Sequence, residues 1–366
     1  MSEGVRIFDE HRNKNLIALK AQLLSGIYRP GASTCFIVTK PSVREVFAAD
    51  FRDRVVHHVL VRVIEPRFEK RFIQNSYACR KGKGIHRALK DVRRDIRRVT
   101  KNNTLPAFFM HLDVSGFFMS IKKDILFALL QKQVKNSTLR ALAQKIIFHD
   151  PTTCFIYRGD PRLQKLVPPH KSLFSVPKGQ GLPIGNLTSQ FFANVYLNEL
   201  DQFVKHTLQV AHYFRYADDV LILAKTREEL PLLRDKIAIF LKDHLALSLN
   251  TQKTKIGALK DGVDWLGYVV HPTHTLVRKR IVRAAKQKIA GFEKMLASLD
   301  EAPSNALRIQ IAASINSYFG FFSHADTFKL RTHLYEKHFV LLHTYLSPTN
   351  KKLISFKPIL ETKAPE

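Results

Sequence analysis

Two short apolar runs that meet at a pair of carboxylates constrain the fold more than any other feature of the chain. In HYFRYADDVLIL, residues 212–223, β-prone residues stand on both sides of Ala217-Asp218. Two such runs joined by a tight turn predict a β-hairpin, with Asp218 and Asp219 at its tip. An isolated Asp pair in a turn often only accepts hydrogen bonds from nearby backbone amides, so the hairpin alone does not define a site.

A second predicted strand also ends at a carboxylate. In LPAFFMHLDVSGFF, residues 105–118, apolar side chains alternate from Phe108 to Leu112, Asp113 follows, and Ser115-Gly116 breaks the strand. Carboxylates at two strand ends suit Mg²⁺, which prefers oxygen ligands and binds through a few carboxylates plus substrate phosphates. Two such ions about 4 Å apart can activate an attacking oxygen and stabilise a leaving oxygen in phosphoryl transfer. The pattern therefore favours nucleotide polymerisation or nucleic-acid cleavage.

The charge of the chain supports a nucleic-acid partner. Lys and Arg number 59 against 31 Asp and Glu, which gives a net charge of +28, and the heaviest basic load lies in residues 51–105. A long polyanion is the expected partner. No apolar stretch approaches the roughly 20 residues of a spanning helix, and the N-terminal residues lack an apolar signal core, so we expect a cytoplasmic protein without a membrane partner.

Cysteine and histidine give no sign of a disulfide framework or a zinc site. Cys35, Cys79 and Cys154 are widely spaced and form no C-x-x-C pair, so we expect reduced thiols. The close pairs His57-His58 and His271/His274 lack neighbours at ligand spacing, and we expect surface or packing roles for them.

Five motifs, taken in order, resemble those of reverse transcriptases, which are RNA-directed DNA polymerases. Residues 113–118, DVSGFF, resemble the first palm motif, and residues 216–219, YADD, resemble the metal-binding hairpin. Between them, residues 184–200 are similar to the motif that opens the palm helix beneath the template–primer duplex. Residues 247–256 and 263–268 resemble the later palm motif and the primer grip. The resemblance covers about residues 40–340.

This resemblance implies an α+β fold of the right-hand polymerase type, with fingers, a palm built on an antiparallel sheet, and a helical thumb. The expected division is an N-terminal extension at 1–50, fingers at 51–106, palm at 107–270, thumb at 271–345 and a tail at 346–366. The palm range includes some fingers elements and a Pro-rich stretch at 150–178 that cannot be one regular element.

Three local signatures resemble the reverse transcriptases of diversity-generating retroelements. Residues 184–190 read IGNLTSQ, where most relatives have Gln-Gly, three residues and Ser-Pro. Residues 75–84 and 168–172 also resemble that subgroup. The resemblance implies an enzyme that copies a template RNA into error-prone cDNA, misreads adenines, holds an RNA/cDNA duplex, and works with a small basic accessory protein.

The family's catalytic roles carry over to matching positions. Asp113 and Asp218 would hold two Mg²⁺ ions, Asp219 would be the supporting third carboxylate, and the Val114 carbonyl would complete the metal shell. Lys253 could protonate the departing pyrophosphate, since a lysine near polyanions is a plausible general acid, or it could be a solvated charge.

Substrate-binding roles have structural alternatives. Phe118 stands where the family places a bulky ring against the sugar C2′, although a lone Phe is often a core residue. Three cations interleaved with Gly82 and Gly84 could clamp the triphosphate of a deoxynucleotide, since glycines allow close backbone approach, or could bind template: Arg80, Lys81 and Lys83.

The two remaining motifs are expected to touch the template–primer duplex. In the palm helix motif the candidates are Ile184, Gly185 and Gln190, and in the grip they are Trp265, Gly267 and Tyr268. Core anchoring is an equal alternative for Trp265, the only tryptophan. The palm helix should begin near Thr188-Ser189, and its apolar stripe indicates packing.

Three other functions stay open on the sequence. Another bacterial reverse transcriptase class, group II intron-like or defence-associated, is the nearest. A catalytically idle RNA-binding scaffold would explain the charge but not the three carboxylates. A metal-dependent nuclease would not need Phe118 or the grip motif.

Overall fold

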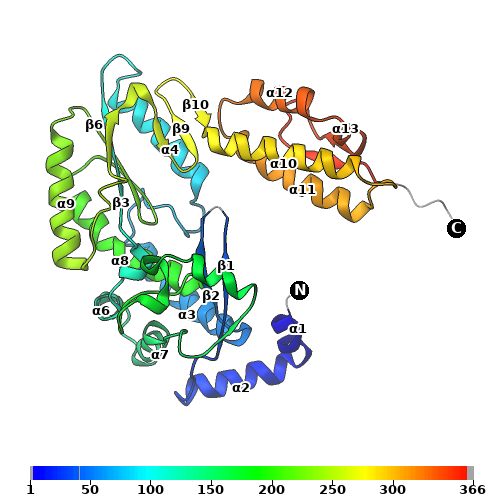
Figure 1. Ribbon diagram of the computed structural model, residues 1–366. Coiled ribbons are helices and arrows are strands. Elements are labelled where there is room, and N and C mark those ends of the chain that lie inside the picture. The colour runs from blue at the N-terminus through cyan, green and yellow to red at the C-terminus, as the bar shows by residue number, and fades with distance from the viewer. Residues whose placement is uncertain (1–2, 41, 361–366) are drawn as a thin grey trace. The chain divides into compact units, whose positions relative to one another are not determined.

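The computed structural model describes residues 3–40 and 42–360 (Figure 1). The chain divides into two compact units, of which unit 1 comprises Met1–Ala88 and Met110–Ile256, and unit 2 comprises Leu89–Phe109 and Gly257–Glu366. The residues predicted as palm fall mostly in unit 1, and those predicted as thumb fall in unit 2. Residues 89–109 belong with unit 2, which the linear division of the sequence did not anticipate.

The N-terminal 50 residues contain a β-hairpin as well as the expected helices. Helices α1 (Glu3–Glu10) and α2 (Arg12–Leu24) precede strands β1 (Ser33–Val38) and β2 (Arg44–Ala48), which pair antiparallel. Strand β4 (Phe155–Tyr157) joins β1 in parallel and gives the sheet order β2-β1-β4. A buried cluster lies beside this sheet and consists of Cys35, Phe47, Met119 and Leu173.

The sheet that carries the predicted carboxylates has the strand order β5-β6-β3-β7. Its strands are β5 (His212–Tyr216), β6 (Asp219–Ala224), β3 (Phe108–Asp113) and β7 (Lys255–Ala258). Strands β5 and β6 pair antiparallel with Tyr216 opposite Asp219, so the predicted hairpin is confirmed. The strand predicted to end at Asp113 is confirmed as β3.

Helices cover the rest of unit 1. They are α3 (Phe51–Glu69), which packs against α8 (Leu187–Gln202), and α5 (Phe117–Ser120), α6 (Lys123–Gln133), α7 (Ser137–Phe148) and α9 (Glu229–Leu245). A π-helical turn, Phe203–Thr207, continues α8. Helix α8 begins at Leu187, one residue before the predicted start near Thr188-Ser189. The side chain of the preceding residue, Asn186, accepts a hydrogen bond from the Ala49 amide.

The Pro-rich stretch at 150–178 is irregular, as predicted. It consists of strand β4 and three short 3₁₀ helices, Pro161–Leu166, Pro169–Lys171 and Leu173–Ser175. Proline removes a backbone donor and fixes φ, which favours such short turns over a continuous helix.

Unit 2 combines a small sheet with helices. Strands β8 (Val263–Trp265), β9 (Tyr268–Val270) and β10 (Thr275–Val277) form an antiparallel sheet, and a 3₁₀ turn, Leu259–Asp261, precedes it. The helices are α10 (Lys279–Ala297), α11 (Asn305–Phe322), α12 (Phe328–His338) and α13 (Leu342–Tyr345). Helix α4 (Ile85–Val99) carries the basic run of the predicted fingers.

The first part of the predicted tail contains two strands. Strands β11 (Leu346–Pro348) and β12 (Phe356–Pro358) pair antiparallel, and the Phe356 ring packs edge-on against Phe319 at 4.9 Å between centroids. Residues 361–366 of that tail lie outside the described residues.

Within residues 3–40 and 42–360, none of the helices is long and apolar enough to cross a bilayer. All three cysteines are free thiols; Cys35 is buried and the other two are exposed.

Candidate active site

Asp113 and Asp218 line one open pocket of unit 1, with a volume of about 560 Å³. Asp113 ends strand β3, and Asp218 lies in the turn between β5 and β6. The sheet order places β6 directly beside β3, so the two strand ends meet at the same edge. The pocket wall also includes Val114, Ser115, Gly116, Phe117, His170, Lys171, Leu249, Asn250, Thr251, Gln252 and Lys253.

The loop after α9 holds Asp113 in place from both sides. The Asn250 amide donates to the Asp113 carbonyl at 2.7 Å, and the Ser115 amide donates to the Ser248 carbonyl at 2.8 Å. These two bonds make an antiparallel bridge between Val114 and Leu249 in which the Val114 carbonyl takes no part. That carbonyl therefore remains a candidate oxygen ligand, as the resemblance implies.

The carboxylate of Asp113 meets a cation on the pocket wall. Its Oδ2 accepts from the Lys253 Nζ at 2.9 Å and from the Asn250 Nδ2 at 3.3 Å. The Lys253 side chain is 61% exposed, so it can move away from Asp113 without leaving a buried charge. This is the geometry that a mobile proton donor beside the carboxylates requires.

The environment of Asp218 favours a cation. The pKa of Asp218 is raised to about 6, chiefly because the carboxyl is buried. The charges of Asp113 and Asp219 also raise this pKa, whereas a backbone hydrogen bond and Lys253 lower it. Like charges this close repel unless a cation neutralises them. Two oxygen-donor carboxylates in an open pocket fit Mg²⁺, which takes further ligands from water and substrate phosphates.

The predicted third carboxylate is bonded to a histidine. The Oδ1 of Asp219 lies 2.5 Å from the Nε2 of His111 on β3, and Asp219 does not line the pocket. Within the described part of the chain, no group of three or more His, Cys, Asp or Glu side chains is arranged to hold a metal ion. Asp113 and Asp218 are therefore the candidate ligands that the pocket brings together, and the supporting role of Asp219 stays a prediction.

Sequence reasoning missed His111, although a signal was present. His111 lies two residues before Asp113, and alternate residues of a strand share one face. The basic residue therefore stands on the face that carries the carboxylate. The pocket-wall residues His170 and Lys171 were also missed as site residues, because a 3₁₀ turn 57 positions after Asp113 gives no periodic link to it.

Phe118 and Ile184 meet at one apolar cluster. Both are partly buried and pack against the cluster of Cys35, Phe47 and their neighbours. The Ile184 carbonyl accepts from the Phe47 amide at 2.8 Å. At Gly185, with φ +123°, a Cβ would lie 2.8 Å from the Val46 Cγ1, so this position excludes any side chain.

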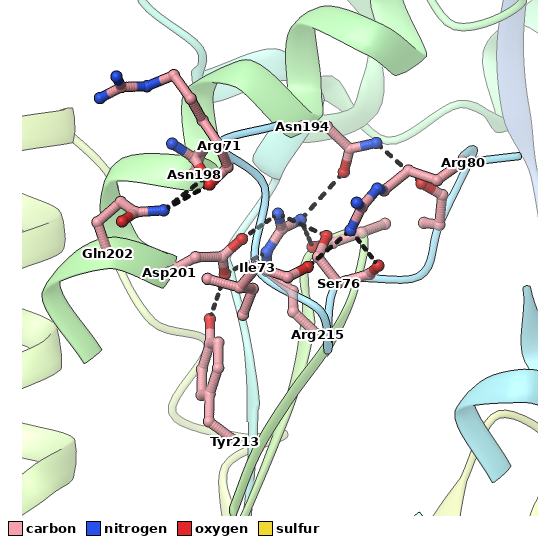
Figure 2. A network of polar contacts seen from close by, with 12 residues as sticks. Arg71, Ile73, Ser76, Arg80, Asn194, Asn198, Asp201, Gln202, Tyr213 and Arg215 are labelled. Atoms are coloured by element: carbon pink, nitrogen blue, oxygen red, sulfur yellow. Dashed lines mark hydrogen bonds and ion pairs between the residues drawn. The ribbon is translucent and has the colours of Figure 1, made fainter. Parts of the chain in front are cut away.

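Two of the three predicted clamp residues have partners within the fold. The Arg80 side chain is only 5% exposed; its Nε donates to Glu69 at 2.9 Å, and its Nη1 donates to the carbonyls of Ile73 and Ser76 (Figure 2). Lys83 donates to the Gln74 carbonyl at 2.8 Å and lies over the Tyr77 ring. Arg80 and Lys83 are thus held by structural contacts, and only Lys81 is exposed.

The grip residues lie in unit 2 and are buried there. Trp265 and Tyr268 are fully buried and pair across the β8–β9 turn. The Tyr268 hydroxyl donates to the Phe321 carbonyl at 2.8 Å, and a Cβ at Gly267 would lie 2.9 Å from the Phe321 Cζ. The core alternative therefore describes these side chains, and their burial does not fit the expected direct stacking on a primer.

Gln190, a candidate of the palm helix motif, is exposed on α8 in unit 1.

Comparison with known proteins agrees with this geometry. Residues 38–270 match the family described as reverse transcriptase (RNA-dependent DNA polymerase). The chain belongs to this family, which confirms the expected enzyme class of RNA-directed DNA polymerase.

Two curated relatives are similar to this chain in sequence. Protein YkfC of Escherichia coli K12 is 24% identical over 296 residues, which cover 72% of this chain and 71% of YkfC. The group II intron-encoded protein LtrA of Lactococcus lactis is 21% identical over 359 residues, which cover 80% of this chain. The chain spans about half the length of LtrA, 55% of it.

A solved structure shows the same fold. Apo telomerase from Candida tropicalis is similar with a TM-score of 0.51 at 10% identity, over 84% of this chain and 59% of that chain. The likeness confirms the right-hand polymerase fold that the sequence predicted, with helices and sheets combined.

Proposed function

We propose that this chain copies an RNA template into DNA by nucleotidyl transfer at the pocket of Asp113 and Asp218. The observation that carries the proposal is that two strand-end carboxylates from distant parts of the sequence line one open pocket in a chain of net charge +28. A pocket of about 560 Å³ is in the range of small-ligand sites.

The two carboxylates would hold Mg²⁺, with the Val114 carbonyl as a further oxygen ligand. When bound, two such ions activate the primer 3′-hydroxyl and stabilise the leaving pyrophosphate. Lys253, 2.9 Å from Asp113 and largely exposed, is placed to give a proton to the pyrophosphate. The exposed cations Lys81 and Lys171 are the proposed phosphate contacts, and dispersed basic side chains would hold the RNA/cDNA duplex.

Primer extension on RNA tests the proposal. Purified protein is given a primer annealed to RNA, Mg²⁺ and deoxynucleoside triphosphates, and Asp218→Asn serves as the matched variant. Template-dependent extension by the wild type alone supports the proposal. Cleavage of the RNA without extension would identify a nuclease, and RNA binding with neither reaction would identify a scaffold.

The finer proposal is that the cDNA is error-prone and serves diversity-generating retrohoming, with a small basic accessory protein as partner. The supporting residues are Ile184 and its neighbours, since Ile offers only shape where Gln would offer a donor and an acceptor. Ile184→Gln should then reduce errors opposite template adenines. Sequencing cDNA made by both enzymes on one RNA measures this, and an unchanged adenine error rate in the active variant would remove Ile184 from the mechanism.

A second candidate, intron-associated reverse transcription, is favoured by the similarity to LtrA over 80% of this chain. The two candidates differ in their RNA. A nearby pair of imperfect repeats that differ at adenines, with a short basic reading frame, supports diversity generation. A flanking structured intron, copied better than a repeat-derived RNA, would support the second candidate.

A further inference from the structure

Arg215 is fully buried two residues before Ala217, in the strand that leads into the turn of Asp218. All three nitrogens of its guanidinium donate hydrogen bonds, five in total, and Figure 2 shows this network. Nε and Nη2 donate to the two carboxylate oxygens of Asp201 at 2.7 and 2.6 Å, and Nη2 also donates to the Ser76 hydroxyl at 3.0 Å. Nη1 donates to the Asn194 side chain at 3.2 Å and to the Ala217 carbonyl at 3.0 Å.

These partners come from three separate segments of unit 1. Asn194 and Asp201 lie seven residues apart on α8, and such spacing puts them on one face of the helix. Ser76 belongs to the segment between α3 and α4. The Ala217 carbonyl belongs to the turn between β5 and β6 that carries Asp218. One side chain therefore joins the palm helix, the segment before Lys81 and the turn.

Backbone hydrogen bonds also join the segment before Lys81 to β5. The Arg215 amide donates to the Asn75 carbonyl at 2.9 Å, and the Tyr77 amide donates to the Arg215 carbonyl at 3.0 Å, so Ser76 bridges in parallel to β5. The Ala78 carbonyl accepts from the Asn194 Nδ2 at 2.8 Å. Residues 75–78 are thus bonded to β5 and α8 just ahead of the exposed Lys81.

An ion pair that only neutralised the buried charge of Arg215 would need fewer of these hydrogen bonds. The pair with Asp201, which also accepts from the Tyr213 hydroxyl at 2.7 Å, neutralises the buried charge. The bond to the Ala217 carbonyl adds a constraint on a residue whose φ is +55°, in the left-handed region that residues other than glycine rarely adopt. Such a conformation persists when its surroundings determine it.

We propose that Arg215 is a positioning residue that holds the Ala217-Asp218 turn and the segment before Lys81 in one arrangement. It thereby keeps the metal-binding carboxylate aligned with the phosphate-binding lysine before a nucleotide arrives. The proposal rests on the function proposed above, but the position of the turn can be measured without catalysis.

The test removes the ion pair without leaving a buried charge. A triple variant, Asp201→Leu with Tyr213→Phe and Arg215→Met, replaces the pair by apolar groups, an exchange that often preserves the stability of a fold. Arg215→Lys is the second variant; it keeps the charge but not the planar fork of donors. Arg308→Met is the matched control, since Arg308 is another buried arginine, bonded to the carbonyls of Pro303 and Ile359 in unit 2.

Two measurements are made on full-length protein. Hydrogen–deuterium exchange should become at least about tenfold faster in residues 73–80 and 213–220 of both Arg215 variants and stay unchanged there in Arg308→Met. The turnover rate of deoxynucleotide incorporation should fall by about 10- to 100-fold, the scale of a displacement near 1 Å, while the RNA affinity is retained.

The outcomes separate the two proposals. Wild-type exchange in both segments of a folded Arg215→Lys or triple variant would overturn the positioning role. Faster exchange with wild-type turnover would also overturn it, because alignment would then not matter. If the wild-type protein itself makes no DNA, the proposed function fails, whereas a change in exchange would still support the link between Arg215 and the turn.

Discussion

The Nε2 of His111 lies 2.5 Å from the Oδ1 of Asp219, across the neighbouring strands β3 and β6. The contact orients the carboxylate that follows Asp218. His111 stands two residues before Asp113, so one strand supplies both a metal-ligand candidate and the partner of the third carboxylate. A hydrogen bond to a charged group of this kind contributes about 1.5–3 kcal/mol.

His111→Phe should therefore lower the turnover rate about tenfold or more, because the Asp219 carboxylate loses its contact with His111 and can then reorient next to Asp218. His111→Gln is the matched control, since its side-chain amide can donate from a position near that of the imidazole Nε2. Single-nucleotide primer extension compares the two. Equal activity of His111→Phe and wild type would show that the contact does not support the reaction.

Phe118→Ala should admit ribonucleotides. The Phe118 side chain is only partly buried against the Phe47 cluster, so part of it stays accessible, and the prediction is that this part excludes a 2′-hydroxyl. Exclusion acts on selectivity, so the measured quantity is the ratio of kcat/KM for deoxy- over ribonucleotides, which should fall at least about tenfold. Met119→Ala, a truncation in the same buried cluster, controls for loss of packing. An unchanged ratio in an active Phe118→Ala variant would leave Phe118 with a packing role only.

The stability of unit 1 should decline on mild acidification because of His57. Burial lowers the pKa of His57 from 6.5 to about 4, so between these values the unfolded chain binds more protons than the folded chain. The contribution of His57 to the free energy of unfolding is therefore fully present above pH 6.5. It falls by about 3 kcal/mol by pH 4, because each unit of pKa difference corresponds to about 1.36 kcal/mol.

Denaturant unfolding at several pH values checks this dependence. His57→Gln should flatten the decline, and His58→Gln, at the exposed neighbour, should leave it unchanged. A decline of the same size in His57→Gln and in wild type would assign the acid sensitivity to another group, such as His149, whose pKa burial also lowers.

The hairpin of Asp218 and the strand of Asp113 could be predicted from sequence, because period-two alternation and a turn between β-prone runs are local signals. The family resemblance then placed both in one site. The Arg215 network could not be predicted this way, since Ser76, Asn194 and Asp201 are brought to Arg215 only by the tertiary fold. The same cause explains Arg80, whose glycine-rich surroundings suggested a phosphate contact although Glu69 lies beside it.

The grip residues show another limit of the sequence, which left a core role and a primer contact equally open for Trp265. Trp265 and Tyr268 lie at the ends of β8 and β9 that face each other across the turn, and both are fully buried. Sequence alternation does not say which face of a three-residue strand is covered, because the covering residue Phe321 of helix α11 lies 53 positions after Tyr268.

The most direct test of the account is primer extension on RNA by Asp113→Asn and Asp218→Asn, beside an RNA-binding measurement on the same proteins. Each variant should lose at least about a thousandfold in Mg²⁺-dependent synthesis, since removal of a metal ligand withdraws the charge that stabilises both reacting oxygens. The RNA affinity of both variants should be nearly that of wild type. It should fall steeply with salt for wild type and for both variants, because it depends on dispersed cations. Retention of more than a trace of synthesis by either folded variant would contradict the central claim.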